Sequence, residues 1–183
     1  MKAIIFDTET TGLIESRKIP LDRQPEIIEF YGEFIDLKTG EKLDELELLI
    51  KPKHVENKKL EPIIEKITGL NYEKDLIDKN DYSDLSKVIQ EFFSQSDCAI
   101  AHNMNYDKEM IEIEQERVGI EFVWPERLIC TIEQTMHLQG YRLNLNKLHT
   151  KLFNEGFKNA HRARNDVEAL TKCCIKLHEM GVI

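Results

Sequence analysis

Apolar and polar positions follow one another in a pattern that predicts three strands in the first fifty residues. A short apolar run over residues 2–7 predicts a buried strand, and alternation over 27–37 predicts a second strand. Residues 38–41 carry a turn signal, after which the apolar residues 46–50 predict a third strand. These three segments predict an antiparallel meander.

Apolar residues three or four positions apart predict helices in the rest of the chain. The first is a short helix over 61–67 that ends at Gly69, and the polar residues 71–82 predict a loop. Ser83 is expected to cap a helix that runs to about Phe93. The remaining expected elements are strands 98–101 and 128–130 and helices 105–119, from about Thr131, 144–153 and 163–180.

A meander followed by strand–helix units predicts an α/β fold. We expect a mixed five-stranded sheet, in which parallel strands join the three-strand antiparallel meander and helices flank both. The chain has 183 residues and contains no repeat, low-complexity segment or linker. We therefore expect a single domain over residues 1–183.

The composition is that of an ordinary globular protein, with 41% hydrophobic and 32% charged residues. The apolar start is too short for a signal peptide, and no run approaches the roughly 20 apolar residues of a membrane span. We therefore expect a cytoplasmic protein without a membrane partner. The spacing of the four cysteines suits no zinc site, so they are expected to be buried free thiols: Cys98, Cys130, Cys173 and Cys174.

The formal net charge of −9 taken alone argues against a nucleic-acid partner, because phosphates favour basic surfaces. The charge is unevenly spread, however, since residues 142–176 hold eight lysines and arginines against three acids. An enzyme that binds divalent cations can also carry excess carboxylates and still receive phosphates. Some basic residues of this region are candidates for lining a phosphate path: Arg142, Lys147, Lys151, Arg162 and Arg164.

Two carboxylates, Asp7 and Glu9, follow the first predicted strand in the segment FDTETTGL. Alternate side chains of a strand share a face, so these two point the same way. Adjacent carboxylates repel unless a cation lies between them, and Mg²⁺ and Mn²⁺ prefer oxygen ligands. An isolated Asp-x-Glu pair more often only begins an exposed loop, so this pair needs support from elsewhere in the chain.

Asp107 ends the segment AHNMNYD and lies in the first turn of a predicted helix. It shares a helix face with Met110 and Ile111, and a carboxylate on an inward face needs a partner because burying a charge is costly. The alternative is a first-turn aspartate that only interacts favourably with the helix dipole. The residues around Asp107 leave both interpretations open.

Asp166 interrupts an apolar helical stripe that includes Ala163, Val167 and Leu170, within the segment HRARND. An unpaired carboxylate rarely points at a core, so this position indicates chemistry. His161 precedes Asp166 by five residues, at the entry to the predicted helix. The unperturbed pKa of histidine, near 6.5, suits a general base near neutral pH. A lone histidine would be an ordinary surface or capping residue, and its proximity to Asp166 is what favours a role.

Together, FDTETTGL, AHNMNYD and HRARND resemble the three exonuclease motifs of the DnaQ-like, DEDDh-type 3′–5′ exonucleases. The resemblance runs from residue 4 to about residue 178 and includes ITGL at residues 67–70, similar to a segment between the family's first two motifs. It implies a ribonuclease H-like fold, which agrees with the strand order predicted above. It also implies release of nucleoside monophosphates from a 3′ end by two-metal-ion hydrolysis.

The resemblance implies a role for each carboxylate and for the histidine. Asp7, Glu9 and Asp166 would bind one of two divalent ions, Mg²⁺ or Mn²⁺, and Asp7 would also touch the second. Asp107 would bind mostly through water. His161 would be the general base that deprotonates the attacking water, and a histidine here indicates the DEDDh type rather than the related tyrosine type.

The resemblance further implies that Thr10, Leu13 and Ile67 contact substrate. The backbone of Thr10 and the side chain of Leu13 would hold the terminal nucleotide, and Ile67 would pack on the penultimate base. We expect the 3′ end of single-stranded or frayed DNA, with RNA 3′-end trimming or oligoribonucleotide degradation as the alternative. A polymerase or other replication protein is a possible partner class, and the oligomeric state stays open.

Two other functions compete with the exonuclease. A non-catalytic nucleic-acid-binding module on the same fold would be favoured by loss of metal-binding carboxylates, yet all four are present. A nuclease that cuts internally is disfavoured by the histidine-type third motif and predicts cleavage of circular substrates.

Overall fold

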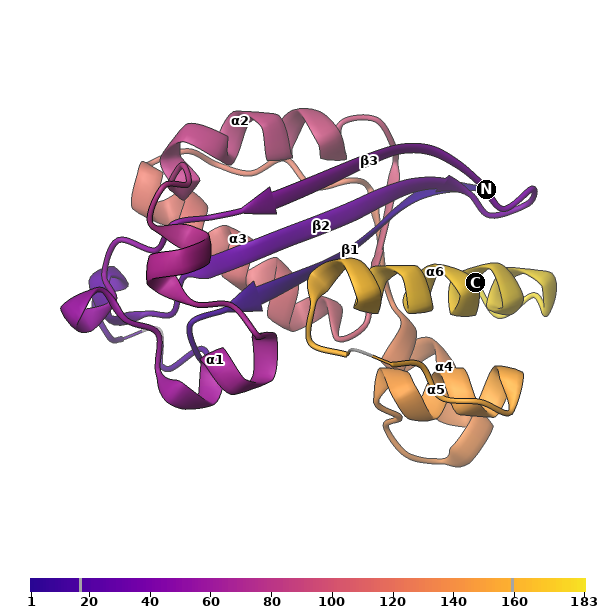
Figure 1. Cartoon of the computed structure of the whole chain (residues 1–183). Helices are drawn as coiled ribbons and strands as arrows, with labels where there is room; N and C mark the ends of the chain where they lie inside the picture. Colours follow the sequence, from indigo (N-terminus) through magenta and orange to yellow (C-terminus); the bar gives the residue numbers. More distant parts are fainter. Residues whose placement is uncertain (17, 159) are drawn as a thin grey trace.

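The computed structural model describes residues 1–16, 18–158 and 160–183. Its strands form a five-stranded mixed sheet in the order β3-β2-β1-β4-β5 (Figure 1). β1, β2 and β3 are antiparallel neighbours, whereas β4 is parallel to β1 and β5 is parallel to β4. This confirms the predicted mixed sheet. The strands are β1 (Lys2–Thr10), β2 (Ile27–Asp36), β3 (Glu41–Leu49), β4 (Cys98–Ala101) and β5 (Arg127–Cys130).

Helices cover both faces of the sheet. α6 lies along one face, against β1 and β2, while α2 and α3 lie on the opposite face (Figure 1). The helices are α1 (Pro62–Thr68), α2 (Tyr82–Phe93), α3 (Met104–Val118), α4 (Thr131–Gln139), α5 (Leu145–Phe153) and α6 (Ala163–Glu179). Shorter helical turns occupy Leu21–Arg23, Glu56–Lys58 and Tyr72–Leu76.

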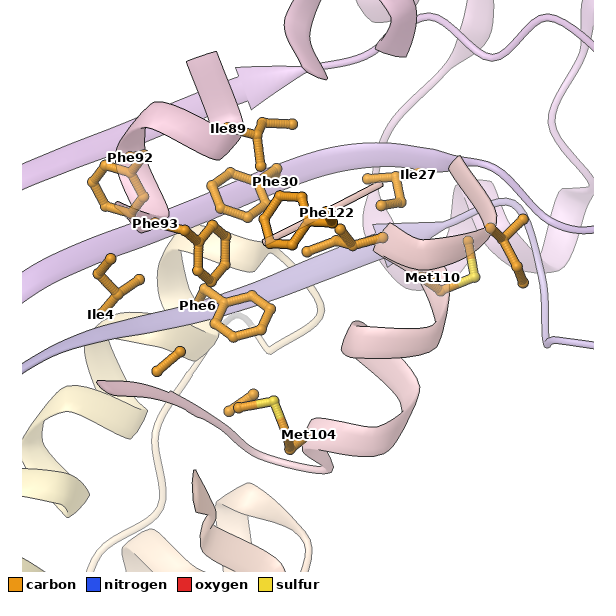
Figure 2. Close-up of a cluster of buried hydrophobic side chains, with 14 of the residues drawn as sticks. Ile4, Phe6, Ile27, Phe30, Ile89, Phe92, Phe93, Met104, Met110 and Phe122 are labelled. Carbon is orange, nitrogen blue, oxygen red and sulfur yellow. The ribbon is translucent and has the colours of Figure 1, made fainter. Parts of the chain in front are cut away.

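Alternation along β1 divides the core into two layers. Ile4 and Phe6 point toward α2 and α3, where the Phe6 ring meets the edge of Phe93 at a centroid distance of 4.8 Å (Figure 2). Ala3 and Ile5 point the other way and pack in a second cluster with α6. Because side chains alternate, odd-numbered positions of β1 continue toward α6 as the strand reaches its carboxyl end.

β3 begins at Glu41, five residues before the predicted strand 46–50. β3 is the edge strand of the sheet, and its first five residues are all exposed. An edge strand exposed in this way lacks the buried, alternating face that makes a strand visible in a sequence. The prediction therefore found only the part with apolar residues.

The predicted loop 71–82 was partly wrong, because Tyr72–Leu76 forms a helical turn. Its N-cap is Asn71, whose side chain accepts hydrogen bonds from the backbone N of Glu73 and of Lys74. Ser83 is likewise not the cap of α2. Asp81 is the N-cap, and its carboxylate accepts a hydrogen bond from the backbone N of Ser83 at 2.9 Å.

The four cysteines are free and buried, as predicted. Burial raises the pKa of the Cys173 thiol to about 12, which keeps it protonated and unreactive. None of the helices in the described ranges is long and apolar enough to cross a membrane.

Candidate active site

The predicted carboxylates converge at the carboxyl end of β1. Asp7 and Glu9 continue the row of β1 side chains that faces α6, and Asp166 lies in the first turn of that helix. Glu9, His161 and Asp166 each place one potential ligand atom within 4.8 Å of the others. Residues more than 150 positions apart in sequence thus meet because the last helix packs on the first strand.

A pocket of about 410 Å³ opens beside this cluster. Asp7, His161 and Asp166 contribute to its wall, so at least two of the carboxylates are reachable by a ligand. The remaining lining residues come from the ends of β4 and α5 and from the segment before α6: His102, Asn144, Leu145, Asn146, Phe157 and Ala160.

Asp107 reaches the cluster from the first turn of α3 and is only 2% exposed. Its Oδ1 accepts hydrogen bonds from the backbone N of Thr8 at 3.1 Å and from the Thr8 hydroxyl at 2.7 Å. Thr8 lies between Asp7 and Glu9 on β1, with its side chain on the α3 side. The inward interpretation of Asp107 is therefore correct, and Thr8 is the partner that its burial requires.

His161 lies immediately before α6, with its side chain exposed. Its φ of 72° is in the left-handed region, which few residues other than glycine, asparagine, aspartate and histidine adopt. The backbone N of His161 donates a hydrogen bond to Oδ2 of Asp166 at 2.8 Å. This bond ties the histidine to a carboxylate of the cluster.

Glu29 and Arg162 lie beside the cluster; Glu29 was not predicted as a site residue, and Arg162 was considered only for a phosphate path. Glu29 is opposite Glu9 in the β1–β2 register and is completely buried. Arg162 forms an ion pair with it, in which Nη2 lies 2.8 Å from Oε1. The signal was present in the sequence, because Glu29 interrupts the apolar run of β2 just as Asp166 interrupts the apolar face of α6.

Mutual repulsion and burial make the carboxylates hard to ionise together. Burial, and then the charges of Asp107 and Glu9, raise the pKa of Asp7 well above its usual value. Burial, followed by the charges of Asp166 and Glu29, raises the pKa of Glu9 to about 8. Carboxylate oxygens are the ligands that Mg²⁺ and Mn²⁺ prefer. The charge of such an ion would relieve the repulsion between these carboxylates.

Two further pKa values in the cluster reflect burial opposed by hydrogen bonding. Burial raises the pKa of Asp107 to about 7, although the hydrogen bonds from Thr8 act against it. Burial also raises the pKa of Asp166, and the backbone hydrogen bond from His161 opposes that shift. All four carboxylates are thus shifted in the same direction.

The three residues predicted to contact substrate lie outside the lining of this pocket. The Thr10 hydroxyl is 2.7 Å from the Tyr106 hydroxyl and 2.8 Å from the carbonyl oxygen of Gly12. Leu13 is 81% exposed in the loop after β1, and Ile67 is 41% exposed on α1. Both apolar side chains are therefore free to contact a ligand.

Two of the arginines considered for a phosphate path are instead engaged by protein carboxylates. Arg162 is paired with Glu29, as described above. Arg164 forms ion pairs with Glu45 at 3.2 Å and Glu47 at 2.6 Å on β3. Arg142 donates a hydrogen bond from Nη2 to Oδ1 of Asn103 at 3.1 Å.

A family model described as "Exonuclease" matches residues 4–174. The chain belongs to this exonuclease family. Within it, the chain is a DnaQ-like, DEDDh-type exonuclease of the ribonuclease H-like superfamily, as the three motifs predicted. The family implies dependence on divalent metal ions.

The curated relatives of this exonuclease include the PolC-type DNA polymerases III of Listeria innocua serovar 6a and Listeria monocytogenes serovar 1/2a. Each is 31% identical over 179 residues. The match covers 94% of this chain and 11% of each relative, so the exonuclease spans about a tenth of their length.

Solved structures confirm the ribonuclease H-like fold. The nuclease domain of 3′hExo, a DEDDh family member bound to rAMP, superposes with a TM-score of 0.79 at 14% identity, covering 99% of this chain and 93% of that one. Cell-death related nuclease 4 superposes with a TM-score of 0.77 at 15% identity, covering 98% and 64%. A 3′-exonuclease whose structure concerns recognition of the histone mRNA stem-loop has a TM-score of 0.77 at 14% identity, covering 99% and 64%.

Proposed function

We propose that this exonuclease hydrolyses nucleic acid from its 3′ end and releases nucleoside monophosphates in the presence of Mg²⁺ or Mn²⁺. The observation that carries the proposal is the convergence of Asp7, Glu9, Asp166 and His161 beside one pocket, with Asp107 hydrogen-bonded to Thr8 of the same strand. Residues 1–183 would act as one exonuclease domain.

The four carboxylates Asp7, Glu9, Asp107 and Asp166 would hold the metal ions. Their four negative charges balance two dications, and the burial and neighbouring acids that raise the pKa values of Asp7 and Glu9 support this role, because a bound cation would relieve the repulsion. When bound, such ions stabilise negative charge on the attacking and leaving oxygens of a phosphodiester. Asp107, with one oxygen held by Thr8, would act mostly through water.

His161 would accept the proton of the attacking water on its imidazole. The His161 side chain is exposed at the pocket, and its backbone N donates a hydrogen bond to Asp166. This position lets the imidazole reach a water in the pocket and then return the proton to solvent. Proton transfer by a positioned histidine is worth about 10²–10⁴-fold in rate.

The loop after β1 and helix α1 would select the 3′ end. The backbone of Thr10 and the exposed side chain of Leu13 would hold the terminal nucleotide, and Ile67 would pack on the next base. The hydroxyls of Thr10 and Tyr106, which meet at 2.7 Å and both contact Gly12, would keep the loop in place for this contact.

We further infer that single-stranded or frayed DNA is the substrate and that a replication polymerase is the partner class. The 31% identical relatives, which are named as DNA polymerases, support this choice. RNA is the second candidate, supported by the structural neighbour described as recognising a histone mRNA stem-loop. That neighbour is only 14% identical, so DNA is favoured.

The test uses 5′-labelled single-stranded DNA and RNA oligonucleotides of one sequence, with Mg²⁺, Mn²⁺ or EDTA. We expect a ladder that shortens from the 3′ end, faster on DNA, and that disappears in EDTA and with Asp7→Ala. Asp78→Ala is the matched control, because Asp78 is exposed and belongs to a different pocket. Cleavage of circular DNA, or no cleavage with either metal, would contradict the proposal.

A further inference from the structure

An ion pair between the buried Glu29 and the partly exposed Arg162 fastens the start of α6 to strand β2. Glu29 is 0% exposed and lies opposite Glu9 across the β1–β2 pairing. Arg162 grips its carboxylate with two nitrogens: Nε lies 3.2 and 3.1 Å from the two oxygens, and Nη2 lies 2.8 Å from Oε1. Such forked pairs fix orientation more strictly than a single contact does.

Glu29 also supplies the cap that α6 lacks locally. Arg162 is the N-cap residue, and its side chain makes no capping hydrogen bond. Instead, Oε2 of Glu29 accepts a hydrogen bond from the backbone N of Ala163 at 3.1 Å, across 134 positions of sequence. One carboxylate thus holds both the side chain of the cap residue and the first free amide of the helix.

His161 lies between two fixed points at this junction. Its backbone N is bonded to Asp166, and the residue that follows it, Arg162, is bonded to Glu29. The left-handed φ of His161 is an uncommon conformation that persists only where the surroundings impose it. The contacts on both sides supply that constraint.

We propose that Glu29 and Arg162 are positioning residues for the reaction, because their pair aligns His161 and Asp166 with Glu9. The proposal rests on the proposed nuclease function. Fold stability alone is a weak reason for this pair, because Glu29 loses all its hydration and its attraction to an arginine that is 39% exposed recovers little of that cost. A fifth carboxylate opposite Glu9 also adds repulsion to the site.

Arg164 provides a matched control on the same turn of α6. It too pairs with the sheet, through Glu45 and Glu47 of β3, but these carboxylates are partly exposed and neither contacts the junction at His161. Removing Arg164 therefore removes a helix-to-sheet ion pair without freeing the histidine. A difference between the two arginines would isolate positioning from general support of α6.

The experiment measures kcat and KM on a single-stranded oligonucleotide for Arg162→Gln, Arg162→Lys, Glu29→Gln and Arg164→Gln. We expect Arg162→Gln and Glu29→Gln to lower kcat by about 10–100-fold, with KM close to wild type. Losses of this size are typical for residues that orient metal ligands without contacting the substrate. Arg162→Lys should restore only part of the rate, because lysine keeps the charge and loses the fork. Arg164→Gln should stay near wild type.

Amide hydrogen exchange tests the junction independently of catalysis. The amides of His161 and Ala163 should exchange faster in Arg162→Gln than in wild type, and Arg164→Gln should leave them protected. Equal losses of kcat in Arg162→Gln and Arg164→Gln, or unchanged exchange in Arg162→Gln, would overturn the positioning role. Wild-type protein without nuclease activity would instead refute the proposed function, while the exchange result still decides whether the pair holds the junction.

Discussion

Two hydrogen bonds join Thr8 to Asp107. Oδ1 of Asp107 accepts one from the Thr8 backbone N at 3.1 Å and one from the Thr8 hydroxyl at 2.7 Å. Thr8 stands between two carboxylates of the cluster, Asp7 and Glu9, and its own side chain faces the other side of β1. Three consecutive residues therefore present two acids toward α6 and fasten a third from α3. This arrangement explains how Asp107 is buried without a cationic partner.

Thr8→Val should weaken both the fold and the reaction. Valine keeps the shape of threonine and loses the hydroxyl donor, which leaves the buried Asp107 carboxylate with one hydrogen bond fewer. We expect the free energy of unfolding to fall by about 1–3 kcal/mol, measured by urea denaturation, together with slower cleavage. Thr8→Ser keeps the donor and is the control. Equal behaviour of the serine and valine variants would show that the hydroxyl is not used.

Without metal, the protein should lose stability as the pH rises. The pKa of Glu9 moves from 4.5 to about 8 on folding and that of Asp107 from 3.8 to about 7, so the folded state binds more protons in this window. The free energy of unfolding is therefore highest below the unfolded pKa values and falls as the pH passes the folded ones.

This pH dependence can be followed as Tm in EDTA and in Mg²⁺ between about pH 5 and 9. In EDTA, Tm should drop toward the alkaline end. Added Mg²⁺ should raise Tm most where the carboxylates are ionised, because a bound ligand stabilises only the folded state. Glu9→Gln should flatten the EDTA profile. A Mg²⁺ effect that is the same at all pH values would indicate that the cation binds elsewhere.

His161→Asn should slow the reaction and leave the fold intact. Asparagine tolerates a positive φ, so the substitution removes the imidazole without adding backbone strain. We expect kcat to fall by about 10²–10⁴-fold with Tm unchanged, because the side chain is exposed. His178→Asn, in the last turn of α6, is the control and should retain the wild-type rate. A near-normal rate in His161→Asn would remove it from the mechanism.

The mixed five-stranded sheet and the positions of Asp7, Glu9 and Asp166 could be predicted because their signals are local. Asp166 was noticed because it breaks a helical stripe of apolar residues, and Asp7 and Glu9 because alternation places them on one face. Each of these inferences needs only neighbours within one or two turns of sequence, which a periodic pattern displays directly.

The Glu29–Arg162 pair was missed because its meaning depends on register. Glu29 becomes a site residue only when β2 is aligned so that it lies opposite Glu9, and α6 is placed so that Arg162 reaches it. A one-residue slip would turn Glu29 to the other face of the sheet. Arg162 was a candidate for a phosphate path for the same reason, since a sequence does not reveal which carboxylate neutralises an arginine.

The roles of Leu13 and Ile67 lead to the last prediction, which concerns substrate affinity. Leu13→Ala and Ile67→Ala each remove an exposed apolar side chain that would cover a base. Neither substitution should change the stability of the fold. We expect kcat/KM for single-stranded DNA to fall roughly tenfold, as loss of about 1.4 kcal/mol of contact would produce. Tm should stay at the wild-type value.

Ile63→Ala is the matched control for this last prediction. Ile63 is 57% exposed and lies on α1 four residues before Ile67, on the same helix face, so it tests whether the base contact is confined to Ile67. Its kcat/KM should remain near wild type. A drop equal to that of Ile67→Ala would mean that α1 contributes bulk or stability rather than a specific base contact. No drop in Leu13→Ala would place the terminal nucleotide away from the loop that follows β1.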